Sequence, residues 1–409
     1  MSIKSKDPKV AKIIQAEEKR QQEELELIPS ENCTSKEIRE ALASVFNDKY
    51  SEGKPHARYY AGQKYVDEIE DLAVSRALKM FKLSPTKWHV NVQPYSGSPA
   101  NAAIYLAFLE FGDKVLGMKL DQGGHITHGL PISFSGRAYN FSSYGVDPKT
   151  ERLNYDEILK IAKREKPKMI VCGATAYSRI IDFKKFSQIA KSVKALLFAD
   201  ISHIAGLIVG GAHPSCFPYA DVVMTTTHKT LRGPRGAIII CKKEYADKID
   251  RAVFPGLQGG PHDHMTAAKA VCFGEALDPE FKTHAKQIVK NAKTLAKELQ
   301  KNGFRIVSGG TDNHLMLVDL RDQKITGKIA QLLLEEAGII VNKSLVPNDP
   351  EKPFVGSGIR LGTPAVTTRG MKEKEMLIIA DLILETIKNR KPKIVRAKVL
   401  KLTKKFPRP

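Results

Sequence analysis

Two ionisable residues in the middle of the chain are spaced for chemistry on a carbonyl compound. Lys229 lies behind three threonines and a histidine, shortly after the apolar segment 222–224, and Asp200 directly follows the apolar segment 195–199. Ligands of open α/β sheets lie at the carboxyl ends of the strands, so we expect the amine and the carboxylate to face one crevice. Burial or nearby cations would lower the pKa of Lys229 and allow a Schiff base with an aldehyde, while a carboxylate can keep a ring nitrogen protonated. Pyridoxal phosphate requires this pair of groups.

A phosphate cradle, Ser96–Ser98, stands before an alanine-rich helical pattern. Ser98 fits the N-cap of that helix and Pro99 fits its first position. Hydroxyl and amide donors at a helix amino end favour an anion. Ordinary capping explains such a motif more often than a ligand does, just as a strand-end aspartate is usually a cap or turn residue. The combination of these features favours a cofactor site.

Two glycine-flanked segments add possible contacts to a cofactor. Gly123 and Gly124 would let the backbone come close, and His125 could stack on a flat ring or simply bond within its loop. Gly259 and Gly260 could offer amides to a phosphate or form a plain turn.

Two further segments carry groups suited to an amino-acid substrate. Tyr50, Glu52 and Tyr60 combine an acid with phenols, as either acid–base residues or a hydrogen-bonded surface loop. Arg360 stands between glycines, where a guanidinium suits bidentate carboxylate binding or a structural salt bridge.

The elements that must position these residues follow an α/β pattern. Short segments rich in Val and Ile alternate with helical patterns in the middle of the chain, which predicts a mostly parallel sheet covered by helices. From about residue 277 two amphipathic helices bracket one strand, as in a smaller α+β domain. We therefore predict a helical arm at 1–25, a large cofactor-binding domain at 26–276 and a small C-terminal domain with a basic tail at 277–409.

The amino-acid composition excludes several classes of protein. The chain has 409 residues, of which 42% are hydrophobic, so it can bury large cores. Its first residues lack the apolar stretch of a secretory signal, and no apolar run predicts a membrane span. Five scattered cysteines without a CxxC pair argue against disulfides and zinc. We expect a cytoplasmic protein with no metal and no membrane partner.

Basic charge is concentrated at the carboxyl end. The net charge is +20, and residues 389–409 hold nine Lys or Arg and no acid. The tail could contact nucleic acid or another polyanion, or be a lysine-rich solvated face. We favour the second interpretation, because no nucleic-acid motif accompanies the charge and apolar residues recur at helical spacing, which predicts docking on the protein. These residues are Val395, Val399, Leu402 and Phe406.

A series of motifs resembles the serine hydroxymethyltransferase family over residues 20 to 385. In chain order they are LIPSENCTS, KYSEG, RYYAG, VQPYSGSPAN, GGHITHG, TTTHKTLRGPRG, FPGLQGGP, SGGTDNHL and SGIRLGTPA. The resemblance implies a fold-type I pyridoxal-phosphate-dependent transferase that converts L-serine and tetrahydrofolate reversibly to glycine and 5,10-methylenetetrahydrofolate. It also implies a homodimer or a dimer of dimers with shared active sites.

The resemblance assigns roles to single residues. Lys229 would carry the cofactor aldehyde, Asp200 would pair with the ring nitrogen and Glu52 would handle protons. The other residues assigned to the cofactor are Ser96, Gly97, Ser98, His125, Thr175, His203, Thr226 and Arg235, with Tyr50, Gly259 and Gly260 from the partner subunit. His228 is assigned a catalytic role, in which it would tune Lys229 together with Arg235. Those assigned to the substrates are Ser30 and Arg360 for the carboxylate, Tyr60 beside the serine hydroxyl, and Leu120, Gly124 and Ser344 for the pterin.

The sequence departs from the family at two places. Ser344 stands where the family often has Asn, and a hydroxyl cannot make both hydrogen bonds of an amide, so the pterin carrier could be tetrahydrofolate or another pterin. Lys54, His56 and Ala57 also differ from the usual residues, and the added positive charge could favour polyglutamate forms.

Two other functions are compatible with parts of the sequence. A folate-independent aldolase for 3-hydroxy amino acids needs the same lysine, aspartate and arginine, but not Glu52 or the pterin surface. A nucleic-acid-binding protein would use the tail 389–409, and its RNA binding would depend strongly on salt. We rank the second far below an enzyme.

Overall fold

The computed structural model describes residues 3–409, which divide into two compact units. The large unit is Thr34–Val289, and the small unit combines the N-terminal segment up to Cys33 with Lys290–Pro409. The domain limits predicted from sequence at 25/26 and 276/277 stay a prediction. The helix α12, Pro279–Lys301, continues through the point where the units divide.

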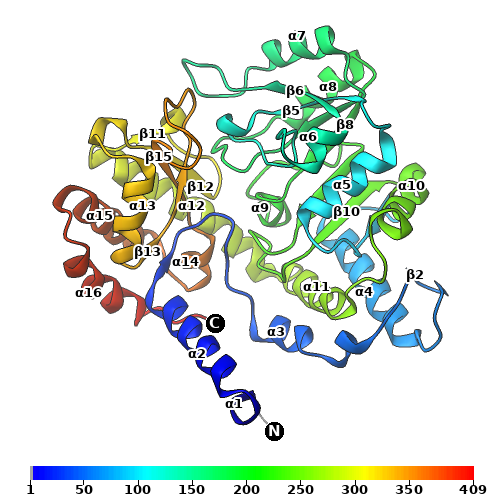
Figure 1. The fold of residues 1–409 in the computed structure, drawn as a ribbon, viewed down its shortest axis with the longest axis horizontal. Coiled ribbons are helices and arrows are strands. Elements are labelled where there is room, and N and C mark those ends of the chain that lie inside the picture. The colour runs from blue at the N-terminus through cyan, green and yellow to red at the C-terminus, as the bar shows by residue number, and fades with distance from the viewer. Residues whose placement is uncertain (1–2) are drawn as a thin grey trace. The chain divides into compact units, whose positions relative to one another are not determined.

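A seven-stranded sheet forms the centre of the large unit (Figure 1). Five neighbouring strands are parallel, and the last two are joined through antiparallel pairs. This confirms the mostly parallel sheet predicted from the Val- and Ile-rich segments. In spatial order the strands are β4 (Trp88–Asn91), β10 (Ala237–Lys242), β9 (Val222–Thr226), β8 (Leu196–Asp200), β7 (Met169–Cys172), β5 (Lys114–Met118) and β6 (Asn140–Tyr144).

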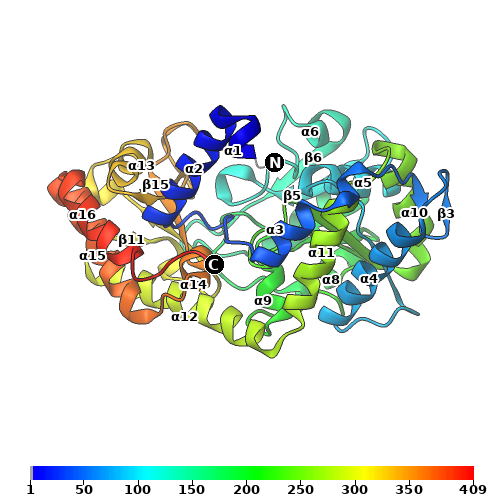
Figure 2. The same ribbon diagram turned by 90° about the horizontal axis from the view of Figure 1, so that it is seen from below.

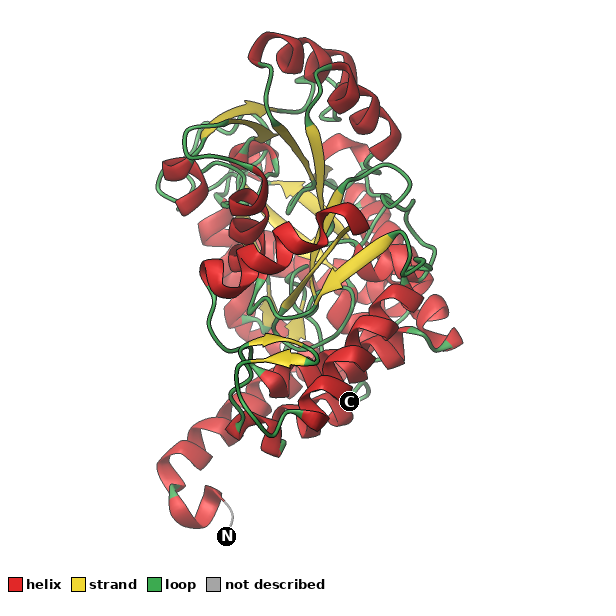
Figure 3. Ribbon diagram, turned by 90° about the vertical axis from the view of Figure 1, so that its right-hand side faces the viewer, coloured by secondary structure: helices red, strands yellow, loops and turns green. Residues whose placement is uncertain are grey.

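Helices cover both faces of this sheet, as the strands flanked by helices in Figure 3 show. Side chains alternate along each strand, so Ile238 and Ile240 of β10 pack on one face and Ile239 on the other. One face lies against α5 (Gly97–Phe108) and α10 (Ala246–Arg251). The other lies against α3 (Lys36–Leu42), α4 (Lys64–Met80), α7 (Tyr155–Glu165), α8 (Phe183–Ser192) and α11 (Asp263–Ala276). Burial on both faces explains why the strands are apolar runs.

The small unit has its own antiparallel sheet, which confirms the predicted α+β fold. Its strand order is β11 (Arg305–Ile306), β12 (Leu315–Asp319), β15 (Gly358–Gly362) and β14 (Asn342–Ser344). Figure 2 shows α15 and α16 side by side in this unit. Its helices include the C-terminal part of α12, α13 (Gly327–Glu336), α14 (Pro364–Thr368), α15 (Glu373–Asn389) and α16 (Pro392–Thr403).

The first and the last described segments of the chain belong to the small unit. The predicted N-terminal helix is α2, Pro8–Glu23, and it leads into β1 (Leu25–Glu26), which pairs with β13 (Ile339–Ile340). The basic tail includes α16, in which Val395, Val399 and Leu402 are buried, and Phe406, three residues after the helix, is partly buried. This confirms that the apolar side of the tail docks on the protein. Within residues 3–409 we find no helix with the length and apolar character needed to cross a bilayer.

Candidate active site

The predicted lysine and aspartate lie at one edge of the large sheet. Asp200 ends β8 and Thr226 ends β9, and these strands are parallel neighbours in which Asp200 is opposite Met224. Lys229 follows β9 by one turn, and its Nζ donates to Thr226 Oγ1 over 3.0 Å. All three side chains are buried. The strand order therefore brings the amine and the carboxylate to the same carboxyl-terminal edge.

Three donors hold the Asp200 carboxylate. Oδ2 lies 3.2 Å from His128 Nε2 and accepts from Asn101 Nδ2 over 3.1 Å, while Oδ1 accepts from the Ser202 backbone N–H over 3.1 Å. Burial alone would raise the pKa of Asp200, but the hydrogen bond with His128 and the charges of His128 and His125 hold that pKa below its ordinary value. The carboxylate is therefore ionised in a site from which water is largely excluded.

His125 belongs to the same network. Its Nδ1 lies 2.7 Å from Thr127 Oγ1, which also accepts from Asn101 Nδ2 over 2.8 Å. Asn101 thus joins His125 to Asp200 through Thr127. The imidazole of His125 also lies 5.7 Å, between ring centroids, from that of His128. This chain of hydrogen bonds fixes the orientation of the ring that was predicted to stack on a cofactor.

The phosphate cradle differs from the prediction in its cap. Helix α5 begins at Gly97 and its N-cap is Ser96, whose carbonyl accepts from the Ala100 N–H over 3.1 Å. Ser98, predicted as the N-cap, is the second residue of the helix, so that prediction was wrong. The prediction took Pro99 as the first residue of the helix. The N–H groups of the whole first turn lack intrahelical partners, so the turn tolerates proline at more than one position.

Gly97 brings the start of α5 against Thr226. A Cβ at this position would lie 2.8 Å from Thr226 Cγ2, which is closer than carbon atoms approach without a shift. Only glycine allows the start of α5 to pack on the threonine that accepts from Lys229. The Ser96 hydroxyl makes no capping bond.

The loop before His125 is held by Thr175. Its hydroxyl donates to the Gly124 carbonyl over 2.7 Å and lies 3.2 Å from the Gly123 carbonyl. A Cβ at Gly124 would lie 2.0 Å from the Met118 carbonyl oxygen, so this position requires glycine. Leu120 lies on the same loop and is exposed.

His203 and His228 occupy two different environments. His203 is buried, and its carbonyl accepts from Thr230 Oγ1 over 2.9 Å. His228 Nε2 lies 3.1 Å from Arg235 NH1, and since a guanidinium only donates, this nitrogen is the acceptor. Burial, with the charges of Lys229 and Arg235, lowers the pKa of His228 to about 3. The imidazole next to Lys229 is therefore neutral.

The predicted acid–base residues form a second cluster on the large unit. Glu52 accepts from Tyr50 Oη over 3.3 Å and from Tyr60 Oη over 3.5 Å, and the two phenol rings pack edge to face. Desolvation and the Glu52 charge raise the pKa of Tyr60. A Cβ at Gly259 would lie 3.1 Å from Glu52 Oε1, and one at Gly260 would lie 3.3 Å from the Tyr50 ring. Five residues predicted from separate motifs are thus neighbours.

The predicted carboxylate-binding residues lie in the small unit. Arg360 is on β15, and its NH2 donates to Asn342 Oδ1 on the adjacent β14 over 2.9 Å. Burial lowers the pKa of Arg360 to about 10. The Gly362 N–H donates to the Leu27 carbonyl over 2.8 Å, which ties β15 to the segment that leads to Ser30. Ser344, on β14, donates its hydroxyl to the Leu345 carbonyl over 3.0 Å.

The comparison with known families gives one match. The family described as serine hydroxymethyltransferase matches residues 3–383. The chain belongs to the serine hydroxymethyltransferase family. Serine hydroxymethyltransferases are fold-type I enzymes that depend on pyridoxal phosphate and use tetrahydrofolate as co-substrate. The match confirms the predicted family, fold class, cofactor and reaction: L-serine and tetrahydrofolate are converted reversibly to glycine and 5,10-methylenetetrahydrofolate.

The residues at the carboxyl edge of the sheet fit the cofactor of serine hydroxymethyltransferases. A buried amine, an ionised buried carboxylate and a helix amino end bearing serine and glycine match its aldehyde, ring nitrogen and phosphate in turn. When bound, pyridoxal phosphate supplies an electron sink for a substrate carbanion. Among residues 3–409 no group of three or more metal-ligating side chains is present.

Sequence reasoning missed several residues of the Asp200 network: Asn101, Thr127, His128 and Ser202. His128 lies in the quoted GGHITHG motif, three residues after His125, and this spacing was an available signal. Asn101 is fully buried in the alanine-rich helix α5, where a polar residue needs a partner. Ser202 accepts from the Thr226 N–H over 3.1 Å and thereby links the two strand ends.

Proposed function

We propose that Lys229 carries the cofactor aldehyde in this serine hydroxymethyltransferase and that Asp200 holds the proton on the cofactor ring nitrogen. The observation that supports these roles is the placement of both residues at the ends of adjacent parallel strands, with three donors that keep Asp200 ionised. A neutral His228, bonded to Arg235, adds no positive charge beside the Lys229 amine. Thr226 accepts from that amine and orients it.

Around this pair we assign the remaining cofactor contacts. Ser96, Gly97 and Ser98 bind the phosphate at the start of α5, and His125 stacks on the ring in an orientation fixed by Thr127. Thr175 supports the same face by holding the loop before His125. His203 lies on the segment after β8 and would lie near the phenolic oxygen of the bound cofactor.

Glu52 is the proposed proton carrier for the serine hydroxyl. Its carboxylate accepts from Tyr50 and Tyr60, so the two phenols orient both of its oxygens. Tyr50 donates to Glu52, so if Tyr50 reaches the active site of the partner subunit, Glu52 lies in that same site. We therefore propose that the whole cluster, including Gly259 and Gly260, serves the partner's cofactor in a homodimer or a dimer of dimers.

Arg360 and Ser30 are proposed to hold the substrate carboxylate. The Asn342 side chain fixes one edge of the guanidinium, which favours a defined orientation of the fork over a freely rotating cation.

For the pterin we propose Leu120 and Gly124, together with Ser344. The Ser344 hydroxyl already donates to Leu345, so it offers a ligand an acceptor rather than the two bonds of an amide. The affinities of the protein for tetrahydrofolate and for other pterins would show which carrier it uses.

The structure weighs against a polyglutamate site at Lys54 and His56. Lys54 lies 3.0 Å from Asp250 and 3.2 Å from Asp247, and His56 lies 2.9 Å from Asp71. A polyglutamate tail would therefore have to compete with these carboxylates for Lys54 and His56. A cytoplasmic location is our further proposal, and it rests on five free, buried cysteines, which suit a reducing compartment.

Subunit mixing tests the shared site. Lys229→Ala and Glu52→Gln chains with different tags are co-expressed, and the heterodimer is purified through both tags. If Glu52 serves the partner, one site of each heterodimer is intact and about half of wild-type activity returns, whereas both parent homodimers are inactive. A heterodimer as inactive as its parents would place both residues in the site of a single subunit.

A further inference from the structure

A cavity of about 660 Å³ opens on the large unit at the end of the sheet opposite to Lys229. Trp88 starts β4, which runs parallel to β9 because both are antiparallel to β10. Phe217 lies in the segment that leads into β9. The cavity therefore lies at the amino ends of these strands, whereas Lys229 and Asp200 lie at the carboxyl ends. It is a separate site, not an extension of the catalytic centre.

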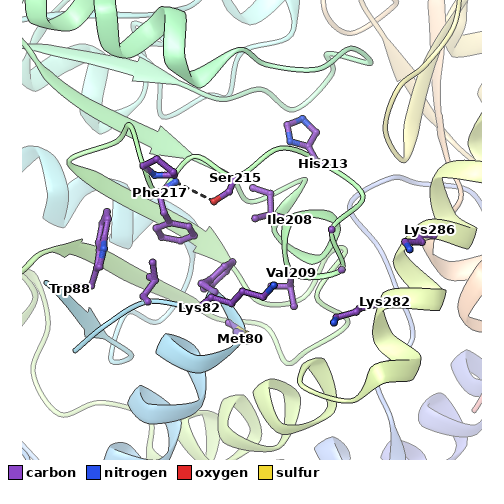
Figure 4. A pocket seen from close by; sticks show the side chains of 15 residues that line it. Met80, Lys82, Trp88, Ile208, Val209, His213, Ser215, Phe217, Lys282 and Lys286 are labelled. Atoms are coloured by element: carbon purple, nitrogen blue, oxygen red, sulfur yellow. Dashed lines mark hydrogen bonds between the residues drawn. The ribbon is translucent and has the colours of Figure 1, made fainter. Parts of the chain in front are cut away.

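The cavity has an aromatic floor. The ring of Phe217 lies 5.4 Å from that of Trp88, nearly perpendicular to it, and 4.8 Å from that of Phe81. Met80 and Ile208 complete the apolar surface, and Figure 4 shows the Trp88 and Phe217 rings side by side there. The floor suits a flat apolar ring, which aromatic side chains hold by stacking or edge contacts.

The rim of the cavity is cationic. Lys82, Lys282 and Lys286 line it, and its fifteen lining residues include no Asp or Glu. Lys282 and Lys286 are one helical turn apart on α12 and project from the same side of the helix in Figure 4. Within residues 3–409, none of the three lysines forms an ion pair with a carboxylate. Three exposed cations without counter-charges favour an anion.

Close packing fixes the cationic rim relative to the aromatic floor. A Cβ at Gly210, at the end of α9 (Ala205–Val209), would lie 2.2 Å from the Ala285 Cβ of α12. This glycine lets the segment bearing Ile208 pack directly on the helix turn between Lys282 and Lys286. The arrangement is thus part of the fold and not a chance alignment of surface side chains.

From this arrangement we infer a binding site for a small aromatic carboxylate, with its ring on Trp88 and Phe217 and its acid group at Lys282, Lys286 and Lys82. A volume near 660 Å³ is within the range of pockets that enclose small-molecule ligands. The inference is independent of the roles assigned above, because none of these residues takes part in the catalytic centre.

The site provides its own reporter, since Trp88 is the only tryptophan in the chain. We would titrate the holoenzyme with 2-naphthoate and with the neutral 2-naphthamide, and measure heat release and Trp88 fluorescence. The first variant is Lys282→Glu/Lys286→Glu. The matched control, Lys293→Glu/Lys297→Glu, makes the same charge change one turn apart on exposed positions of the same helix, away from the cavity lining.

The proposal predicts saturable binding of 2-naphthoate with a change in Trp88 emission. The amide and the Lys282→Glu/Lys286→Glu variant should each bind about tenfold more weakly, while the control pair stays within about twofold of wild type. The cofactor content and circular dichroism of all variants should match wild type. Equal binding of acid and amide, equal loss in both double variants, or no saturable binding of 2-naphthoate would each overturn the proposal.

Discussion

Lys269 offers a quantitative test of the electrostatics beside the segment that leads to the proposed phosphate cradle. It lies on α11, is 1% exposed and donates from Nζ to the carbonyls of Val92 and Pro94 over 2.6 and 3.1 Å. A Cβ at Gly236 would lie 2.6 Å from its Cε, so the stem of the lysine fills this space completely. Lys269→Met keeps most of the stem and removes the amine.

Burial lowers the pKa of Lys269 to about 7, with the Glu70 charge acting in the opposite direction. In the unfolded chain the amine stays protonated until its ordinary pKa of about 10.4. Between these two values the unfolded state binds more protons than the native state, so this group makes stability increase with pH. The contribution is complete above the unfolded pKa and is lost as the pH falls through the native one. Integrated from pH 7 to pH 9, it amounts to about 2 kcal/mol.

The assay is urea unfolding of wild type and Lys269→Met, both saturated with cofactor, at pH 7 and pH 9. Titrations common to both proteins cancel in the difference between them. The free energy of unfolding of wild type should rise by about 2 kcal/mol more than that of the variant over this interval. A difference between the two proteins that is the same at both pH values would refute the lowered pKa.

Three further changes test the catalytic cluster and the carboxylate site. Gly97→Ala places a methyl group against Thr226 and should weaken cofactor affinity about tenfold. The affinity is measured by titrating the apoenzyme with cofactor. Unchanged affinity would show that the contact between residue 97 and Thr226 relaxes without affecting cofactor binding. Asp200→Asn should retain cofactor but lower kcat about a hundredfold, because a neutral amide does not hold the ring proton; full turnover would contradict the assigned role. Arg360→Lys removes the planar guanidinium and should raise KM for serine about tenfold or more. An unchanged KM would exclude a contact between Arg360 and the serine carboxylate.

Much of the fold could be predicted because its strands are short apolar runs. Val222 and Val223 of β9 and Ile238–Ile240 of β10 are buried on the two faces of the sheet, and this requirement for apolar residues at successive positions is visible in the sequence. The pairing of Leu25 with Ile339 was not visible, because it joins residues that are far apart through a strand of only two residues. This pairing is what places the N-terminal segment with the C-terminal part of the chain.

The candidate site was predictable where a residue type carries the chemistry by itself. Lys229, Asp200 and Arg360 belong to this kind. Asn101 and Ser202 could not be predicted in this way, because an amide or a hydroxyl gains its role only from the partner that the fold supplies. The helix start at Gly97 was misplaced for a similar reason: its close contact with Thr226 is a tertiary feature, whereas the Ser-Pro pair next to it gives a local signal.

Chemical trapping of the cofactor tests the central assignment most directly. Borohydride reduction of the holoprotein makes the bond between the cofactor and its lysine permanent, and digestion followed by mass spectrometry identifies the peptide that carries the added mass. If Lys229 carries the cofactor aldehyde, the label is found on Lys229 and is absent after Lys229→Ala. Label on Lys269, the other buried lysine among residues 3–409, whose pKa is lowered by burial, would contradict the assignment.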